Sequence, residues 1–79
     1  MHDAIINARA SIGYNCIINS KALIEHDCKV SNHCHISTNA VINGGVTIED
    51  GCFIGSGATT NNSITIKKNS FIKAGSIVK

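Results

Sequence analysis

An apolar residue recurs at every sixth position of this 79-residue chain, and this repeat restricts the possible folds more than any other feature. The register runs from one end to the other without an insertion. A period of six fits neither an α-helix nor a plain strand, so the chain is built from repeats. All the recurring residues except Thr60 are Ile or Val: Ile6, Ile12, Ile18, Ile24, Val30, Ile36, Ile42, Ile48, Ile54, Thr60, Ile66, Ile72 and Val78.

A small residue usually stands two places before each apolar one, and the residue between the two varies freely. Such an inward–outward–inward alternation is typical of a short strand. Three residues then remain to turn the chain. The third of them is often a residue that tolerates positive φ. The residues of this kind are Asn15, Asp27, His33, Asn39, Gly45, Gly51, Gly57, Asn69 and Gly75.

Each hexapeptide is therefore predicted to form one strand and one turn, and three of them to close a triangular coil of 18 residues. Coils of this kind stack about 4.8 Å apart through parallel pairing. The chain has enough residues for a little over four coils. We expect a single all-β domain, a parallel β-helix over residues 1–79.

In this fold residues 18 apart stack, so the outward mid-strand residues divide into three faces. Face B is polar, whereas faces A and C are too apolar to leave exposed to water. A prism with two apolar faces is expected to form a closed homotrimer, with face A of one copy against face C of the next. Face A carries Ile5, Leu23, Val41, Thr59 and Ile77, face B carries Ser11, Lys29, Thr47 and Thr65, and face C carries Ile17, His35, Phe53 and Phe71.

The net charge of +2 gives no strong attraction to nucleic acid or to a membrane surface. No apolar run approaches the ~18 residues of a membrane span, and the N-terminus lacks the pattern of a signal peptide. We expect a cytoplasmic protein with no nucleic-acid or membrane partner.

The four cysteines, Cys16, Cys28, Cys34 and Cys52, all occupy the small inward position. A buried free Cys behaves as a small apolar residue. No Cys-x-x-Cys spacing is present, so we expect neither a disulfide nor a metal.

Two histidines are candidates for chemistry. His26 lies at the middle of the turn between faces A and B, and Asp27 beside it could hold one ring nitrogen while the other accepts a proton. The alternative is a solvated surface histidine. His35 lies on face C, so it can approach His26 only across a subunit interface. Gly44 stacks on His26, where a glycine lets a backbone N–H approach a ligand closely.

Two lysines stack above acidic residues. Lys67 lies one coil above Glu49, and Lys68 lies one coil above Asp50. We expect ion pairs between coils here, rather than a phosphate site.

Several segments resemble the sialic acid O-acetyltransferase family, which includes bacterial UDP-sugar N-acetyltransferases. The most specific is the Ile-Glu-His-Asp-Cys run with a second histidine, His35, nine residues after His26. The segments that carry the resemblance are 18–20, 24–28, 35–37, 44–48 and 53–58.

The resemblance implies a left-handed β-helix, a homotrimer with active sites between subunits, and acetyl-CoA as co-substrate without a metal. By resemblance, His26 is the general base that takes a proton from a sugar amine or hydroxyl, and Asp27 orients it. His35 lies near the acetyl-CoA thioester, and the Gly44 N–H holds the acetyl carbonyl. Asn19 corresponds to a polar residue at the acceptor site.

Full members of that family carry a nucleotide-sugar-binding α/β domain before the helix. We therefore expect this chain to be the β-helix portion of a longer acetyltransferase. The alternatives are a non-catalytic trimeric scaffold or an inactive remnant. A β-helix carbonic anhydrase would need three histidines converging on zinc, and His26, His33 and His35 do not share one stacked row. An ice-binding solenoid would need a longer row of threonines than Thr47 and Thr65 provide. The sequence leaves the acceptor, and N- versus O-acetylation, open.

Overall fold

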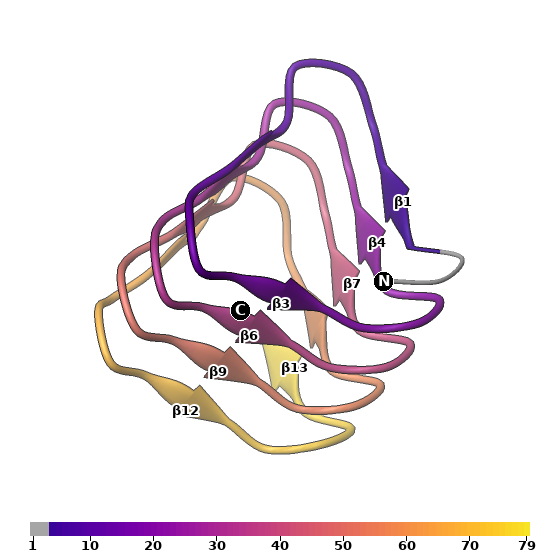
Figure 1. The fold of residues 1–79 in the computed structure, drawn as a ribbon. Coiled ribbons are helices and arrows are strands. Elements are labelled where there is room, and N and C mark those ends of the chain that lie inside the picture. Colours follow the sequence, from indigo (N-terminus) through magenta and orange to yellow (C-terminus); the bar gives the residue numbers. More distant parts are fainter. Residues whose placement is uncertain (1–3) are drawn as a thin grey trace.

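The computed structural model describes residues 4–79, and they form a triangular parallel β-helix (Figure 1). Every strand is two residues long, and every connection is a tight turn. The predicted all-β fold is confirmed. The strands are β1 (Ile5–Ile6), β2 (Ser11–Ile12), β3 (Ile17–Ile18), β4 (Leu23–Ile24), β5 (Lys29–Val30), β6 (His35–Ile36), β7 (Val41–Ile42), β8 (Thr47–Ile48), β9 (Phe53–Ile54), β10 (Thr59–Thr60), β11 (Thr65–Ile66), β12 (Phe71–Ile72) and β13 (Ile77–Val78).

The strands form three parallel sheets, one for each side of the prism. Sheet A has the order β1-β4-β7-β10-β13, sheet B the order β11-β8-β5-β2, and sheet C the order β12-β9-β6-β3. Paired residues are 18 apart, as in Leu23 with Val41 and Lys29 with Thr47. The predicted coil length is therefore confirmed. In Figure 1 the chain winds anticlockwise as it recedes from the N-terminal coil, which is a left-handed course.

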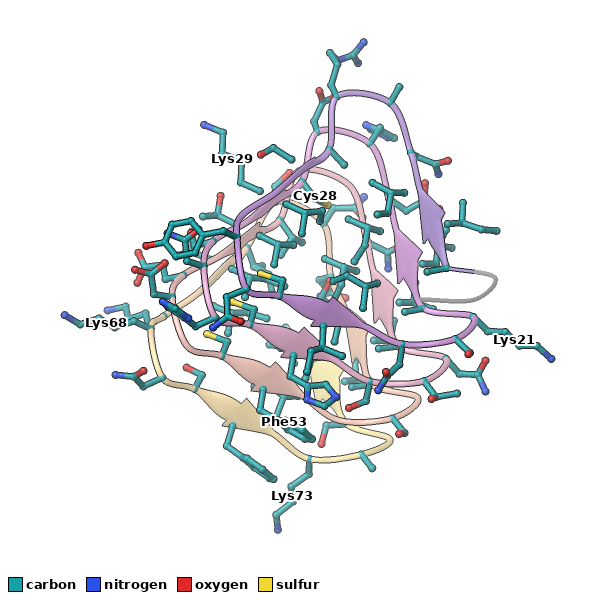
Figure 2. All side chains as sticks on the ribbon, in the orientation of Figure 1. Lys21, Cys28, Lys29, Phe53, Lys68 and Lys73 are labelled. Atoms are coloured by element: carbon teal, nitrogen blue, oxygen red, sulfur yellow. The ribbon has the colours of Figure 1, made fainter. Side chains whose placement is uncertain are left out.

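The inward residues of the middle coils make one continuous core. Ile24, Ile36, Ile42, Ile48 and Ile54 are fully buried. The residues two places earlier, mostly Ala and Cys with Val46 as the bulkiest, lie against them in the same core. Figure 2 shows the labelled lysines, by contrast, pointing away from the prism.

All four cysteines are free, and they do more than fill space. Each thiol lies near a turn carbonyl of the next coil, at 2.9 Å from Ser31 O for Cys16 and 3.0 Å from Asn43 O for Cys28. Cys34 and Cys52 make the same contact at 3.2 and 3.1 Å. Desolvation raises the pKa of Cys28 and of Cys34, so these thiols stay protonated and can donate.

The third turn residue has positive φ in every turn of the described chain. The prediction from Asn, Asp, His and Gly at this position is thus confirmed. The same conformation also occurs at Arg9, Lys21 and Ser63, with φ of 58°, 60° and 57°. Stacking on neighbouring coils imposes it there, since these residue types gain nothing from it locally.

The exposure of the three sheets agrees with the expected faces. Sheet B presents polar residues, while Ile5 and Ile77 on sheet A and Ile17 and Phe71 on sheet C are more than half exposed. On sheet C the rings of Phe53 and Phe71 stack at a centroid distance of 4.9 Å. Two sides of the prism therefore offer apolar surface.

The expected ion pairs between Lys67 and Glu49 and between Lys68 and Asp50 are wrong. Glu49 instead accepts a hydrogen bond from the backbone N–H of Lys68 at 3.1 Å. Asp50 accepts one from the N–H of Asn32 at 2.9 Å. The backbone N–H of the second turn residue has no backbone acceptor. The carboxylates of Asp50 and Glu49 therefore accept hydrogen bonds from such N–H groups instead of pairing with the flexible ammonium groups of the lysines.

Among the described residues, no helix has the length and apolar character that a membrane crossing requires.

Lys21 provides a test of the turn argument. Lys21→Gly is expected to stabilise the folded protein by about 1 kcal/mol, because glycine adopts positive φ without steric cost. Asn39→Gly is the matched control at the same place one coil later, and should gain less because Asn tolerates this conformation. Urea unfolding of both variants measures the difference. Equal effects of the two substitutions would show that local backbone strain does not govern these turns.

Candidate active site

The candidate site lies at the corner between sheets A and B, where the turn after β4 carries His26 and Asp27. His26 Nδ1 is 3.1 Å from Asp27 Oδ2. A carboxylate can only accept here, so Nδ1 carries the proton and Nε2 of the neutral ring is left with its lone pair. The pair can therefore act as a general base toward a group placed at Nε2.

Gly44 covers this ring from the next coil. A Cβ at Gly44 would lie 3.0 Å from both Cε1 and Nε2 of His26, which is tighter than ordinary packing allows. The turn is fixed from below by a hydrogen bond from Gly45 N to His26 O at 3.0 Å. The N–H of Gly44 itself donates to no atom within the described residues. It is therefore available to an oxygen of a bound molecule.

Arg9 holds the other side of the Asp27 carboxylate. Its Nε donates to Oδ1 at 2.6 Å and its Nη2 to Oδ2 at 3.1 Å, a two-pronged contact between coils. This contact fixes the plane of the carboxylate. It therefore also fixes the oxygen that His26 meets.

The pKa of Asp27 is lowered to about 2, chiefly by the hydrogen bonds from Arg9 and then from His26. The hydrogen bonds that Arg9 donates to Asp27, and then the negative charge of that carboxylate, raise the pKa of Arg9. The carboxylate consequently stays ionised throughout the pH range in which an imidazole titrates.

These groups line an open depression of about 340 Å³. Its walls combine a base, a free backbone N–H and several neutral polar groups, which suits a polar acceptor. The lining residues are Glu25, His26, Asp27, Asn43, Gly44, Gly45, Asn62 and Ser63.

The remaining predicted site residues lie together on another part of the prism. Asn19 Nδ2 is 3.0 Å from His35 Nε2, on sheet C and the turn that follows it. The His35 ring lies against Phe53, with centroids 5.0 Å apart. The predicted site residues thus form two separate groups within the chain, His26 with Asp27 and Gly44, and Asn19 with His35.

Arg9 was not predicted as a site residue, although the rule that residues 18 apart stack pairs it with Asp27. No role was predicted for Glu25 either, whose carboxylate accepts a hydrogen bond from Asn7 Nδ2 at 2.8 Å. Over residues 4–79, no three His, Cys, Asp or Glu side chains converge as a metal site would require.

Comparison with protein-family models identifies the repeat. The model described as bacterial transferase hexapeptide, with six repeats, matches residues 27–62. This stretch of hexapeptide repeats includes Asp27, His35 and Gly44, and it begins one residue after His26. A search of curated proteins gave no match.

Solved structures show the same fold. The acetyltransferase domain of PglB from Neisseria gonorrhoeae FA1090 is 24% identical, with a TM-score of 0.81 over 98% of this chain and 46% of that one. The same domain in complex with acetyl coenzyme A is 25% identical, with a TM-score of 0.75 over 95% of this chain and 42% of that one. The chain thus spans less than half of these structures.

The comparisons confirm the hexapeptide-repeat β-helix that the sequence predicted. The narrower resemblance to the sialic acid O-acetyltransferase family stays a prediction. The same holds for the roles of the five site residues.

Removing Arg9 is expected to free Asp27. In Arg9→Met the Asp27 pKa should rise from about 2 toward its ordinary value near 4, because two donated hydrogen bonds are lost. The carboxyl carbon shift of Asp27, followed by NMR against pH, measures it. A folded-state pKa below the unfolded one stabilises the fold above pH ~4, and this contribution is lost as pH falls through about 2. A wild-type midpoint near 4 would contradict the clamp.

Proposed function

We propose that this chain is the catalytic β-helix of an acetyltransferase that moves an acetyl group from acetyl-CoA to an amine or hydroxyl of a sugar. The observation that carries the proposal is the His26–Asp27 pair, whose ring lies directly against Gly44 of the next coil. The acetyl coenzyme A complex of a protein with the same fold supports the choice of co-substrate.

The proposed reaction is a direct transfer. His26 Nε2 removes the proton of the acceptor as its nitrogen or oxygen attacks the thioester carbonyl carbon. The carbonyl oxygen gains charge and is held by the Gly44 N–H. The carbon–sulfur bond then breaks, and the proton on His26 passes to the departing thiolate. Asp27 keeps the ring in the required tautomer and stabilises the imidazolium between the two proton transfers.

The complete site is proposed to form between subunits of a homotrimer. Face A and face C are apolar and exposed, so face A of one copy would cover face C of the next. That contact brings His35 and Asn19 of one copy toward His26 of its neighbour. The thioester would then lie between His35 and Gly44, with Asn19 on the acceptor side.

A variant of the base tests this assignment. His26→Ala is expected to lower the transfer rate by about 10²–10⁴-fold while acetyl-CoA binding remains, because a positioned base acts only in the chemical step. CoA release with a panel of amino sugars and sialic acids as acceptors measures the rate, and calorimetry measures binding. His33→Ala is the matched control, since His33 lies at the corner between sheets B and C, where its Nδ1 meets Asn15 at 2.8 Å. Equal rates for His26→Ala and the wild type would rule out the base.

Mixed trimers test whether the site is shared. His26→Ala and His35→Ala subunits, each inactive alone, are expected to recover about a quarter of the wild-type activity when refolded together in equal amounts. Any mixed trimer with head-to-tail contacts has one interface that joins an intact His26 to an intact His35. Absence of recovery would place the whole site within one protomer. An inert scaffold would show no transfer by any of these proteins, the wild type included.

A further inference from the structure

Thr60 is the one residue of the sixfold apolar row that is neither Ile nor Val, and its side chain is fully buried. Thr has nearly the shape of Val but adds a hydroxyl, which costs free energy inside an apolar core unless it is hydrogen-bonded. The hydroxyl must therefore meet a partner in the coil beside it.

A regular hydrogen bond links the coils where each strand ends. The first turn residue donates its N–H to the carbonyl of the residue 17 places later, which belongs to the apolar row. Nine residues make this bond, at 2.7–2.9 Å: Asn7, Gly13, Asn19, Glu25, Ser31, Ser37, Glu49, Gly55 and Asn61.

Asn43, which should pair with Thr60 in this way, does not. Its N–H donates to Thr60 Oγ1 at 3.1 Å, and its side-chain Nδ2 donates to Thr60 O at 2.7 Å. The backbone pairing of β7 with β10 accordingly contains only Thr59 with Val41. Two side-chain bonds thus replace one backbone bond at this point of the ladder.

The chain contains its own controls for the cause of this exchange. Asn7, Asn19 and Asn61 occupy the same turn position as Asn43, and all three keep the regular backbone bond. Their partners, Ile24, Ile36 and Val78, have no hydroxyl. An asparagine alone therefore does not produce the exchange, and the Thr60 hydroxyl is what distinguishes this turn.

The exchange occurs next to the candidate site. Asn43 opens the turn that carries Gly44, and both residues line the depression beside His26. We propose that Thr60 and Asn43 are positioning residues that set the start of this turn and so hold Gly44, and with it the orientation of its N–H, against the His26 ring. This inference rests on the proposed function only for the use made of that N–H.

The geometric part is tested by NMR on the free protein. Thr60→Val removes the hydroxyl acceptor while keeping the volume of the side chain. The N–H of Asn43 should then donate to the carbonyl of residue 60, as in the other turns, and the Asn43 side-chain amide should leave that carbonyl. The Gly44 amide resonance should shift, and the nuclear Overhauser contact between a Gly44 Hα and the His26 ring should weaken. Thr60→Ser retains the hydroxyl and should resemble the wild type. Asn61→Ala, at the equivalent turn position one coil later, should leave the Gly44 signals in place.

Unchanged Gly44 signals in a folded Thr60→Val protein would overturn the proposal. Should that variant fail to fold, Asn43→Ala provides the second test, because it frees the same turn without changing the core. The same shift of Gly44 is expected there, and its absence would count against the proposal equally.

The role of Gly44 in binding is tested by calorimetric titrations that compare acetyl-CoA with CoA. Thr60→Val is expected to reduce the preference for acetyl-CoA by about five- to tenfold, the worth of one well-placed hydrogen bond. An unchanged preference, despite a shifted Gly44, would show that this N–H does not hold the acetyl carbonyl. If the wild type binds neither compound, the proposed function fails, while the NMR result still decides whether Thr60 positions the turn.

Discussion

The structure depends on one interaction, the in-register stacking of residues 18 apart through parallel backbone hydrogen bonds. Strands of two residues are far too short to hold a fold by themselves. Each becomes stable because its neighbours above and below repeat the same apolar pair in the same register. The core row from Ile18 to Ile66 is buried by that repetition, and every turn takes the same left-handed residue at its end.

Stacking also builds the candidate site, because it places residues from separate coils in direct contact. Arg9 from one coil, Asp27 from the second and Gly44 from the third meet at one corner without any long connection. A local departure from the repeat then matters more than the repeat itself. The bond exchange at Thr60 lies beside the free N–H of Gly44, in a ladder that is otherwise regular at this position.

Most of the fold was predictable from the sequence because one period fixes both the inward and the outward residues. The same rule could have found the Arg9–Asp27 clamp, since the two are 18 apart. It failed for Lys67 and Glu49, because stacking sets which residues are neighbours and not which donor a carboxylate chooses. The positive φ of Lys21 and the hydrogen bond from the Asn43 side chain to Thr60 O could not be predicted from the repeat for a similar reason. Neither follows from the preference of the residue type: Lys21 takes the conformation of the turns it stacks with, and the Asn43 side chain binds Thr60 of the next coil.

We propose that the exposed faces A and C join copies of this chain into a trimer with an acetyl-CoA site at each interface. The most direct measurement is a calorimetric titration of acetyl-CoA into the purified chain, with the oligomer mass recorded by light scattering on the same sample. We expect a trimer that binds acetyl-CoA saturably, with one site per subunit. A folded monomer, or a folded trimer that binds no acetyl-CoA, would contradict it.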